Sequence, residues 1–122
     1  MKVNTAALSG AALDWAVAKC EGFDSIEYER RRIATRHRRD DAQPRSYQPS
    51  TDWSQGGPLI EREKIELIPP VDENDLYWMA VWHQSDNGEA GIQEGPTPLI
   101  ATMRCYVSSK LGDEVDVPES LL

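Results

Sequence analysis

The chain has 122 residues, of which 39% are hydrophobic and 28% are charged, and its formal net charge is −8. This length is typical of one domain, so we expect residues 1–122 to fold together. The negative charge argues against direct nucleic-acid binding by the whole surface. No apolar run is long enough to cross a membrane and no secretory leader pattern is found, so we expect no membrane partner.

The first predicted helix runs from Gly10 to Cys20, after a short extended entry at residues 3–7. Ser9 is a typical N-cap residue, and Gly22 is a typical residue for the position after a helix end. Helical spacing assigns a core face to the larger apolar side chains of this segment. With Cys105, Cys20 is one of two cysteines, and we expect both to be buried, reduced thiols.

Residues 23–28 alternate loosely between large and polar side chains, which predicts a strand. The strongly polar, arginine-rich segment 29–46 then predicts a mobile loop or the tip of a hairpin. Residues 30–45 hold seven arginines against two aspartates, a net charge of +5 that leaves −13 for the rest of the chain.

The segment from Tyr47 to Pro58 is the strongest functional signal in the chain. It combines two aromatic rings, several hydroxyl and amide side chains, one carboxylate and a Gly-Gly-Pro turn. Rings provide faces for stacking, and glycine allows a close approach to the backbone. We interpret the segment as a loop that holds a flat polar ligand. The alternative is that Trp53 closes the core and Asp52 makes only a turn.

The rest of the chain predicts a short helix beginning at Pro58, an extended exit over residues 65–71 and a strand at 76–83. A polar loop is expected at 85–95. Thr97 and Pro98 then predict the start of a helix that ends at Leu111, before a short edge strand at 114–117. These elements predict an α+β fold, in which two main helices pack on one face of a small antiparallel sheet.

Three blocks of the sequence carry a resemblance to a known family. They are residues 8–18, residues 47–63 with Pro-Ser-Thr-Asp-Trp-Ser-Gln-Gly-Gly-Pro at 49–58, and residues 95–115 with Gly-Pro-Thr-Pro-Leu-Ile at 95–100. They resemble the NinX-like family of tailed bacteriophages, a domain of unknown function. The resemblance implies a phage-encoded accessory protein of the host cytoplasm during infection, and it supplies no reaction. Residues 30–45 and 84–94 lie outside it.

Catalytic parts are missing from the sequence. His37 and His83 are the only histidines, and neither belongs to a recognisable motif. No His or Cys pair has metal-ligand spacing, and no phosphate-binding glycine loop is found. We therefore expect no catalytic residues, no metal and no cofactor, and the remaining alternative is a small phosphodiesterase, which would turn over a cyclic nucleotide.

Candidate ligand-binding residues come from the ring-bearing segment and from two helix starts. The first turns of both main helices lack acidic residues, which suits a phosphate, although capping by their own side chains satisfies the same geometry. Basic side chains offer a partner for an anion, although surface ion pairs with nearby acids are the alternative. The candidate residues are Trp15, Lys19, Tyr47, Ser50, Thr51, Asp52, Trp53, Gly56, Gly57, Thr97 and Arg104.

Together these features predict a non-catalytic protein that sequesters a small nucleotide-like ligand, such as a host immune signalling nucleotide. Useful sequestration needs an affinity near 1 nM, about −12 kcal/mol, which a shallow site on a small monomer would not supply. We therefore expect a homo-oligomer with sites near the subunit interface. The alternative is an acidic protein–protein inhibitor of a host nucleic-acid-binding enzyme, suggested by the charge of −13 outside the arginine-rich segment.

Overall fold

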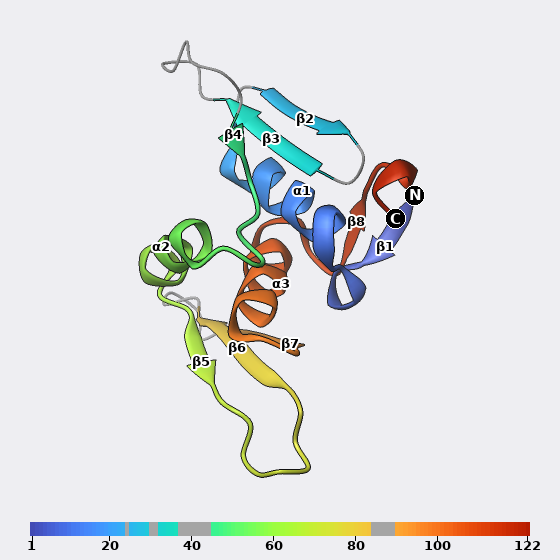
Figure 1. The fold of residues 1–122 in the computed structure, drawn as a ribbon. Helices are drawn as coiled ribbons and strands as arrows, with labels where there is room; N and C mark the ends of the chain where they lie inside the picture. The colour runs from blue at the N-terminus through green and yellow to red at the C-terminus, as the bar shows by residue number, and fades with distance from the viewer. Residues whose placement is uncertain (24, 30–31, 37–44, 84–89) are drawn as a thin grey trace.

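The computed structural model describes residues 1–23, 25–29, 32–36, 45–83 and 90–122. Within them the fold is α+β, as predicted, with helices and strands distributed along the chain (Figure 1). The helices are α1 (Gly10–Glu21), α2 (Trp53–Glu63) and α3 (Pro98–Leu111), with 3₁₀ turns η1 (Thr5–Ala7) and η2 (Glu119–Leu121). The strands are β1 (Lys2–Asn4), β2 (Ser25–Glu29), β3 (Arg32–Arg36), β4 (Arg45–Ser46), β5 (Glu66–Ile68), β6 (Trp78–His83), β7 (Ala90–Gly95) and β8 (Glu114–Asp116).

The strands that the structure describes form three small antiparallel sheets rather than one. Their orders are β1-β8, β2-β3-β4 and β5-β6-β7. Two of these sheets lie on opposite sides of the helices α1 and α3, which contact each other (Figure 1). The expectation of two helices on one face of one sheet is therefore corrected, because α1 packs on β2 and β3 whereas α3 packs on β6 and β7.

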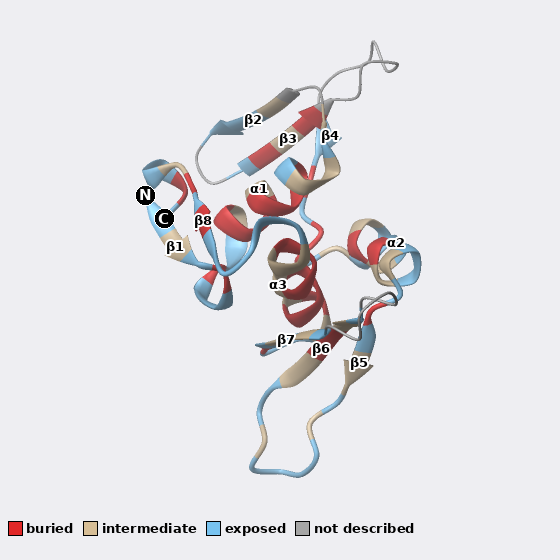
Figure 2. Ribbon diagram, turned by 180° about the vertical axis from the view of Figure 1, so that it is seen from behind, coloured by how far each residue is buried: buried red, intermediate tan, exposed pale blue. Residues whose placement is uncertain are grey.

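Helix α3 lies at the centre of this arrangement, and Figure 2 shows it largely buried. It begins and ends as the sequence predicts, with Thr97 as the N-cap, Pro98 in the first turn and Gly112 at its end. Its start lies close to β7, since a side chain at Gly95 would meet the backbone of Ala101. The buried residues of α3 are Leu99, Ala101, Thr102, Met103, Cys105, Tyr106 and Val107.

Helix α1 also follows the prediction, from Ser9 as the N-cap to Gly22 in the left-handed region with φ of 71°. The expectation for the thiols holds fully for Cys105, which is buried, whereas Cys20 is half-buried. Both cysteines are free, and burial raises the pKa of each thiol to about 12. Such thiols are poor nucleophiles, because the thiolate is the reactive form.

Two stretches expected to be loops contain strands. In the arginine-rich segment 29–46, β3 pairs with β2 and β4 because Ile33 and Thr35 alternate inward and are buried, while residues 30–31 and 37–44 lie outside the described residues. In the segment 85–95, β7 pairs with β6, and residues 84–89 lie outside the described residues. Gly91 allows the indole of Trp82 to lie across the β7 backbone. The polar sequence of this segment gives no signal for that contact, so it does not predict the strand.

Helix α2 begins five residues earlier than predicted, at Trp53 instead of Pro58. Asp52 caps the helix, because its Oδ1 accepts hydrogen bonds from the Ser54 N–H at 2.9 Å and from the Ser54 hydroxyl at 2.6 Å. Pro58 lies inside the helix, and the Gly-Gly pair that precedes it is helical. The expected loop is therefore a turn followed by a helix.

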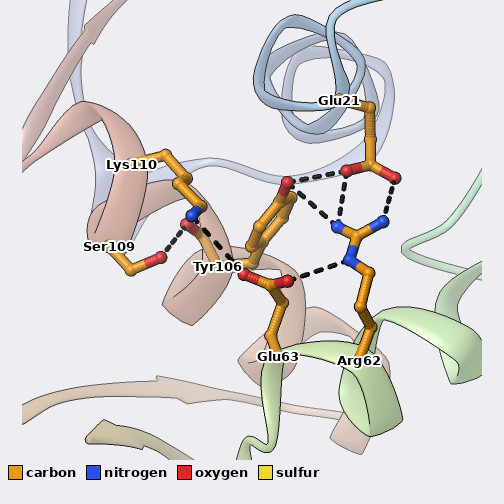
Figure 3. Close-up of polar contacts among 6 residues, drawn as sticks. All are labelled: Glu21, Arg62, Glu63, Tyr106, Ser109 and Lys110. Atoms are coloured by element: carbon orange, nitrogen blue, oxygen red, sulfur yellow. Dashed lines mark hydrogen bonds and ion pairs between the residues drawn. The ribbon is translucent and has the colours of Figure 1, made fainter. Parts of the chain in front are cut away.

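The three helices meet at a polar junction (Figure 3). Arg62 of α2 donates two hydrogen bonds to Glu21 of α1, at 3.0 and 2.6 Å, and one to Glu63, at 2.9 Å. The hydroxyl of Tyr106 from α3 donates to Glu21 at 2.7 Å, and Lys110 lies 3.6 Å from Glu63. Bidentate pairing is directional, so this junction fixes the end of α2 against the other helices.

The paired glycines of α2 predict unequal responses to a methyl group. A Cβ at Gly56 would overlap the Pro49 carbonyl and lie 2.8 Å from a Leu99 methyl carbon. A Cβ at Gly57 would lie 3.8 Å from the Trp53 ring, an ordinary van der Waals contact. We expect Gly56→Ala to destabilise the fold by about 1–3 kcal/mol. Gly57→Ala should change stability by no more than about 1 kcal/mol, because the better helix propensity of alanine is opposed by crowding of its Cβ against the ring of Pro58. Urea unfolding midpoints test the pair, and equal destabilisation by both would contradict this packing.

Candidate functional site

A hollow of about 210 Å³ lies between the turn before α2 and the start of α3. Its lining brings together four of the residues predicted from the sequence, although they are up to 47 positions apart in the chain. We call it the Trp53 hollow. It is lined by Ser50, Thr51, Trp53, Thr97, Pro98, Leu99 and Ile100.

The turn that precedes Trp53 is held by hydrogen bonds to its own backbone. The Gln48 carbonyl accepts from the Thr51 and Asp52 N–H groups, at 3.1 and 2.8 Å. The Gln55 side chain closes the turn from the helix side, since it accepts from the Gln48 N–H at 2.6 Å and donates to the Ser46 carbonyl at 2.8 Å. These bonds fix the backbone conformation of the turn, and they thereby fix the positions of Ser50 and Thr51.

Trp53 is the first residue of α2, and its side chain is 54% exposed. Asp52 fixes this position by capping the helix, so the carboxylate that sequence analysis assigned to ligand binding also performs the alternative structural role. An exposed indole beside a hollow retains a free ring face for stacking. Trp53 is therefore not the core residue that the alternative required.

The other side of the hollow is the N-terminus of α3. The Thr97 hydroxyl accepts a hydrogen bond from the Ile100 N–H at 3.1 Å, and the Ala101 N–H bonds to the Thr97 carbonyl at 3.0 Å. Pro98 has no N–H, so α3 satisfies most of its own first-turn donors. The first turn contains no acid, and the helix dipole still favours a negative group there. The Thr97 hydroxyl keeps its proton to donate.

A buried carboxylate anchors the turn that carries Ser50. Asp14 of α1 is only 5% exposed, and its Oδ1 accepts a hydrogen bond from the Ser50 N–H at 2.9 Å. Burial raises the pKa of Asp14 to about 6, although its interactions with Ser50 act in the opposite direction. The turn is thus attached to the first helix through one charged acceptor.

The Ser50 hydroxyl is the least satisfied polar group of the hollow. Ser50 is 2% exposed, and its Oγ has no partner with hydrogen-bonding geometry among the described residues. It lies close enough to Asp14 to help lower the pKa of that carboxyl, but this contact is not a well-formed hydrogen bond. A buried hydroxyl without a good partner costs free energy, and such groups mark strained or functional positions.

The remaining predicted residues lie outside the hollow. On α1, the Lys19 ammonium lies 5.5 Å from the ring centre of Trp15, a cation–π pair that the spacing of four residues indicated. Tyr47 is buried and packs edge-on against Phe23, with ring centres 5.0 Å apart, so its ring belongs to the core. Gly56 gives the close approach expected of it, but to Pro49 and Leu99 of the chain itself.

Arg104 donates hydrogen bonds to backbone carbonyls of the protein in this structure. Its Nε donates to the Leu8 carbonyl and its Nη1 to the Glu94 carbonyl, both at 2.8 Å. Burial lowers the pKa of its guanidinium, whereas Tyr77 acts in the opposite direction. Arg104 lines a second, wider hollow of about 670 Å³ with Ala6, Tyr77, Ile92, Gln93, Glu94 and Pro96.

The N-terminus of α1 differs from that of α3. Ser9 makes no side-chain capping bond, and Gly10 has a positive φ of 55°. Residues 7–12 line a hollow of about 320 Å³ together with Leu121 and Leu122. Capping by the helix's own side chains therefore explains the start of α3 but not that of α1.

Sequence analysis missed Asp14 and Gln55, which organise the turn without lining the hollow. A signal for Asp14 exists, because it is the only charged residue between positions 10 and 18 of an alanine-rich helix. A lone acid in an apolar helix is buried only when it has a partner. The partner itself, a backbone N–H 36 residues away, has no sequence signal.

The family model described as bacteriophage P22, NinX matches residues 4–110. The chain belongs to the bacteriophage P22 NinX family. This confirms the resemblance predicted from the sequence, and the match spans every residue of the Trp53 hollow and the polar junction. No curated protein matches the chain.

The described part of this NinX family member contains no group of three or more His, Cys, Asp or Glu residues placed to hold a metal ion. None of its described helices is both long and apolar enough to cross a membrane.

The pKa of Asp14 predicts a pH-dependent stability difference. Because its folded-state pKa is raised from 3.8 to about 6, the stability it contributes is present below pH 3.8 and is lost as the pH rises through about 6. Asp14→Asn keeps an acceptor for Ser50 and removes the charge. Relative to wild type, this variant should gain up to about 3 kcal/mol of unfolding free energy between pH 4 and pH 7. Urea unfolding at several pH values measures the gap, and a gap independent of pH would contradict the raised pKa.

Proposed function

We propose that this NinX family protein binds a small nucleotide-like ligand at the Trp53 hollow and sequesters it without chemical change. The proposal rests on one observation. An exposed indole borders a hollow with three hydroxyl side chains, and the buried Ser50 hydroxyl among them has no well-formed partner. The ring suits a base, the hydroxyls suit ring nitrogens or ribose oxygens, and the acid-free start of α3 suits a negative group.

The size of the hollow limits what one chain binds. Ligand sites that enclose a drug-sized molecule measure about 300–1,000 Å³, so 210 Å³ accommodates a base or a sugar but not a whole dinucleotide. A larger ligand stacked on the exposed face of Trp53 would extend beyond the hollow, and that part would be open to solvent. Tight binding then needs a second copy of the chain to cover it, in agreement with the expected homo-oligomer.

Calorimetry with cyclic dinucleotides and ADP-ribose derivatives tests the proposal. Trp53→Ala should weaken binding by about 1–3 kcal/mol because stacking is lost, and Trp53→Phe should retain part of it. Tyr77→Ser is the matched control, because Tyr77 is exposed and does not line this hollow. Absence of heat and of a thermal shift across the whole panel would overturn the proposal.

The oligomeric state gives a separate check on the site. If a second copy completes the hollow, light scattering at working concentration should show an assembly larger than the 13.7 kDa chain, with or without ligand. Trp53→Arg should weaken that assembly, because it places a charge where the ring is covered. A monomer at all concentrations, even with saturating ligand, would remove this part of the proposal.

The acidic-inhibitor alternative makes different demands. It requires a basic host protein as partner and an affinity that falls with salt, because exposed charges are screened. It does not require Trp53, so Trp53→Ala should leave inhibition intact. The two functions are thus separable with one variant.

A further inference from the structure

The connection between β5 and β6 projects from the body of the protein, away from the helices (Figure 1). We call residues 69–77 the acidic arm. Two antiparallel strands can be joined by a two-residue turn, so a nine-residue connection is longer than the sheet requires. Figure 2 shows that its surface is largely exposed.

The acidic arm exposes apolar side chains. Val71 is 82% exposed, Leu76 70% and Tyr77 49%. On the adjacent strand β7, Ile92 is 59% exposed and shares the 670 Å³ hollow with Tyr77. Single exposed apolar residues are ordinary, but a group of them rimmed by polar residues marks an interaction surface.

The arm also has a defined shape. The Asp72 carboxylate accepts from the Asn74 and Asp75 N–H groups, at 2.8 and 3.2 Å. The Asp75 carboxylate accepts from the Val71 and Tyr77 N–H groups, at 3.3 and 3.1 Å. These four bonds hold the apolar side chains outward before any partner arrives, which reduces the entropy lost on binding.

The charge of this surface decides which partner it fits. Residues 69–77 hold Asp72, Glu73 and Asp75 and no basic residue, a net charge of −3. In the hollow itself, Glu94 accompanies Arg104, whose Nε and Nη1 already donate to backbone carbonyls. Nucleic acid is disfavoured by the acids, and two arms facing each other would repel.

We infer that the acidic arm and the adjoining Tyr77–Ile92 hollow bind a basic, apolar segment of a partner protein. The partner inserts one or two apolar side chains between Tyr77 and Ile92, and its Lys or Arg side chains contact Asp72, Glu73 and Asp75. This surface is separate from the Trp53 hollow, since the two hollows share no lining residue. The inference therefore does not depend on the proposed ligand.

A displayed library of random 15-residue peptides tests this inference without knowledge of the natural partner. The full-length protein is the bait, and Tyr77→Ser is the bait for counter-selection. We expect enriched peptides in which Lys or Arg flank large apolar residues. A selected peptide, labelled and titrated by fluorescence anisotropy, should bind Tyr77→Ser at least about tenfold more weakly.

Two further variants test the contribution of charge and the independence of the two surfaces. Glu73→Gln removes a charge at the tip and should weaken peptide binding by about two- to fivefold at low salt, with the difference vanishing at high salt. Trp53→Ala should leave peptide binding unchanged, and unaltered thermal unfolding of all variants shows that they are folded. Failure to enrich any peptide, enrichment without basic residues, or equal binding by Tyr77→Ser would each overturn the inference.

Discussion

The burial of α3 is the constraint on which the rest of the structure depends. This helix contacts α1, α2, β6 and β7, so each neighbour gains its core by packing on it. Glycines allow its neighbours to pack closely against it. Gly95 of β7 lies against the backbone of Ala101, and Gly56 of α2 lies against the side chain of Leu99. Because interiors are close-packed, the α3 surface fixes where the turn before α2 lies. The Trp53 hollow is a consequence, formed where that turn reaches the exposed start of α3.

Local signals in the sequence were sufficient for the elements whose ends are encoded by capping residues. Helix α3 has Thr97, Pro98 and Gly112, and α1 has Ser9 and Gly22, so both were predicted nearly to the residue. The start of helix α2 is predicted too late because Pro58 is a strong start signal, while the competing cap at Asp52 lies in a stretch whose glycines and proline are typical of a loop. A chain with two start signals six residues apart leaves the choice to tertiary contacts, here those of Gly56.

The strands and the site needed information that the chain does not express locally. The pairing of β7 depends on Trp82 lying over Gly91, and β3 depends on two inward residues within an arginine-rich stretch. Four of the predicted ligand residues lie together at the Trp53 hollow. Their residue types alone identified them as candidates, but no local signal in the sequence predicted that they would meet. Tyr47 and Arg104 were candidates that lie outside this hollow. A tyrosine ring is as suitable for core packing as for stacking on a ligand, and a guanidinium binds backbone carbonyls as readily as it binds an anion.

The Trp53 hollow and the acidic arm lie on elements that differ in how they are supported. The hollow is built on Asp14, Gln55 and Thr97, which attach its walls to three helices. The arm projects from the sheet and is held by hydrogen bonds to its own Asp72 and Asp75 carboxylates. A site that must retain a small ligand needs walls that do not move, because each loosened side chain costs affinity. A protein-binding arm tolerates local opening, provided that its apolar side chains stay exposed. The support of each surface thus fits the kind of partner that we propose for it.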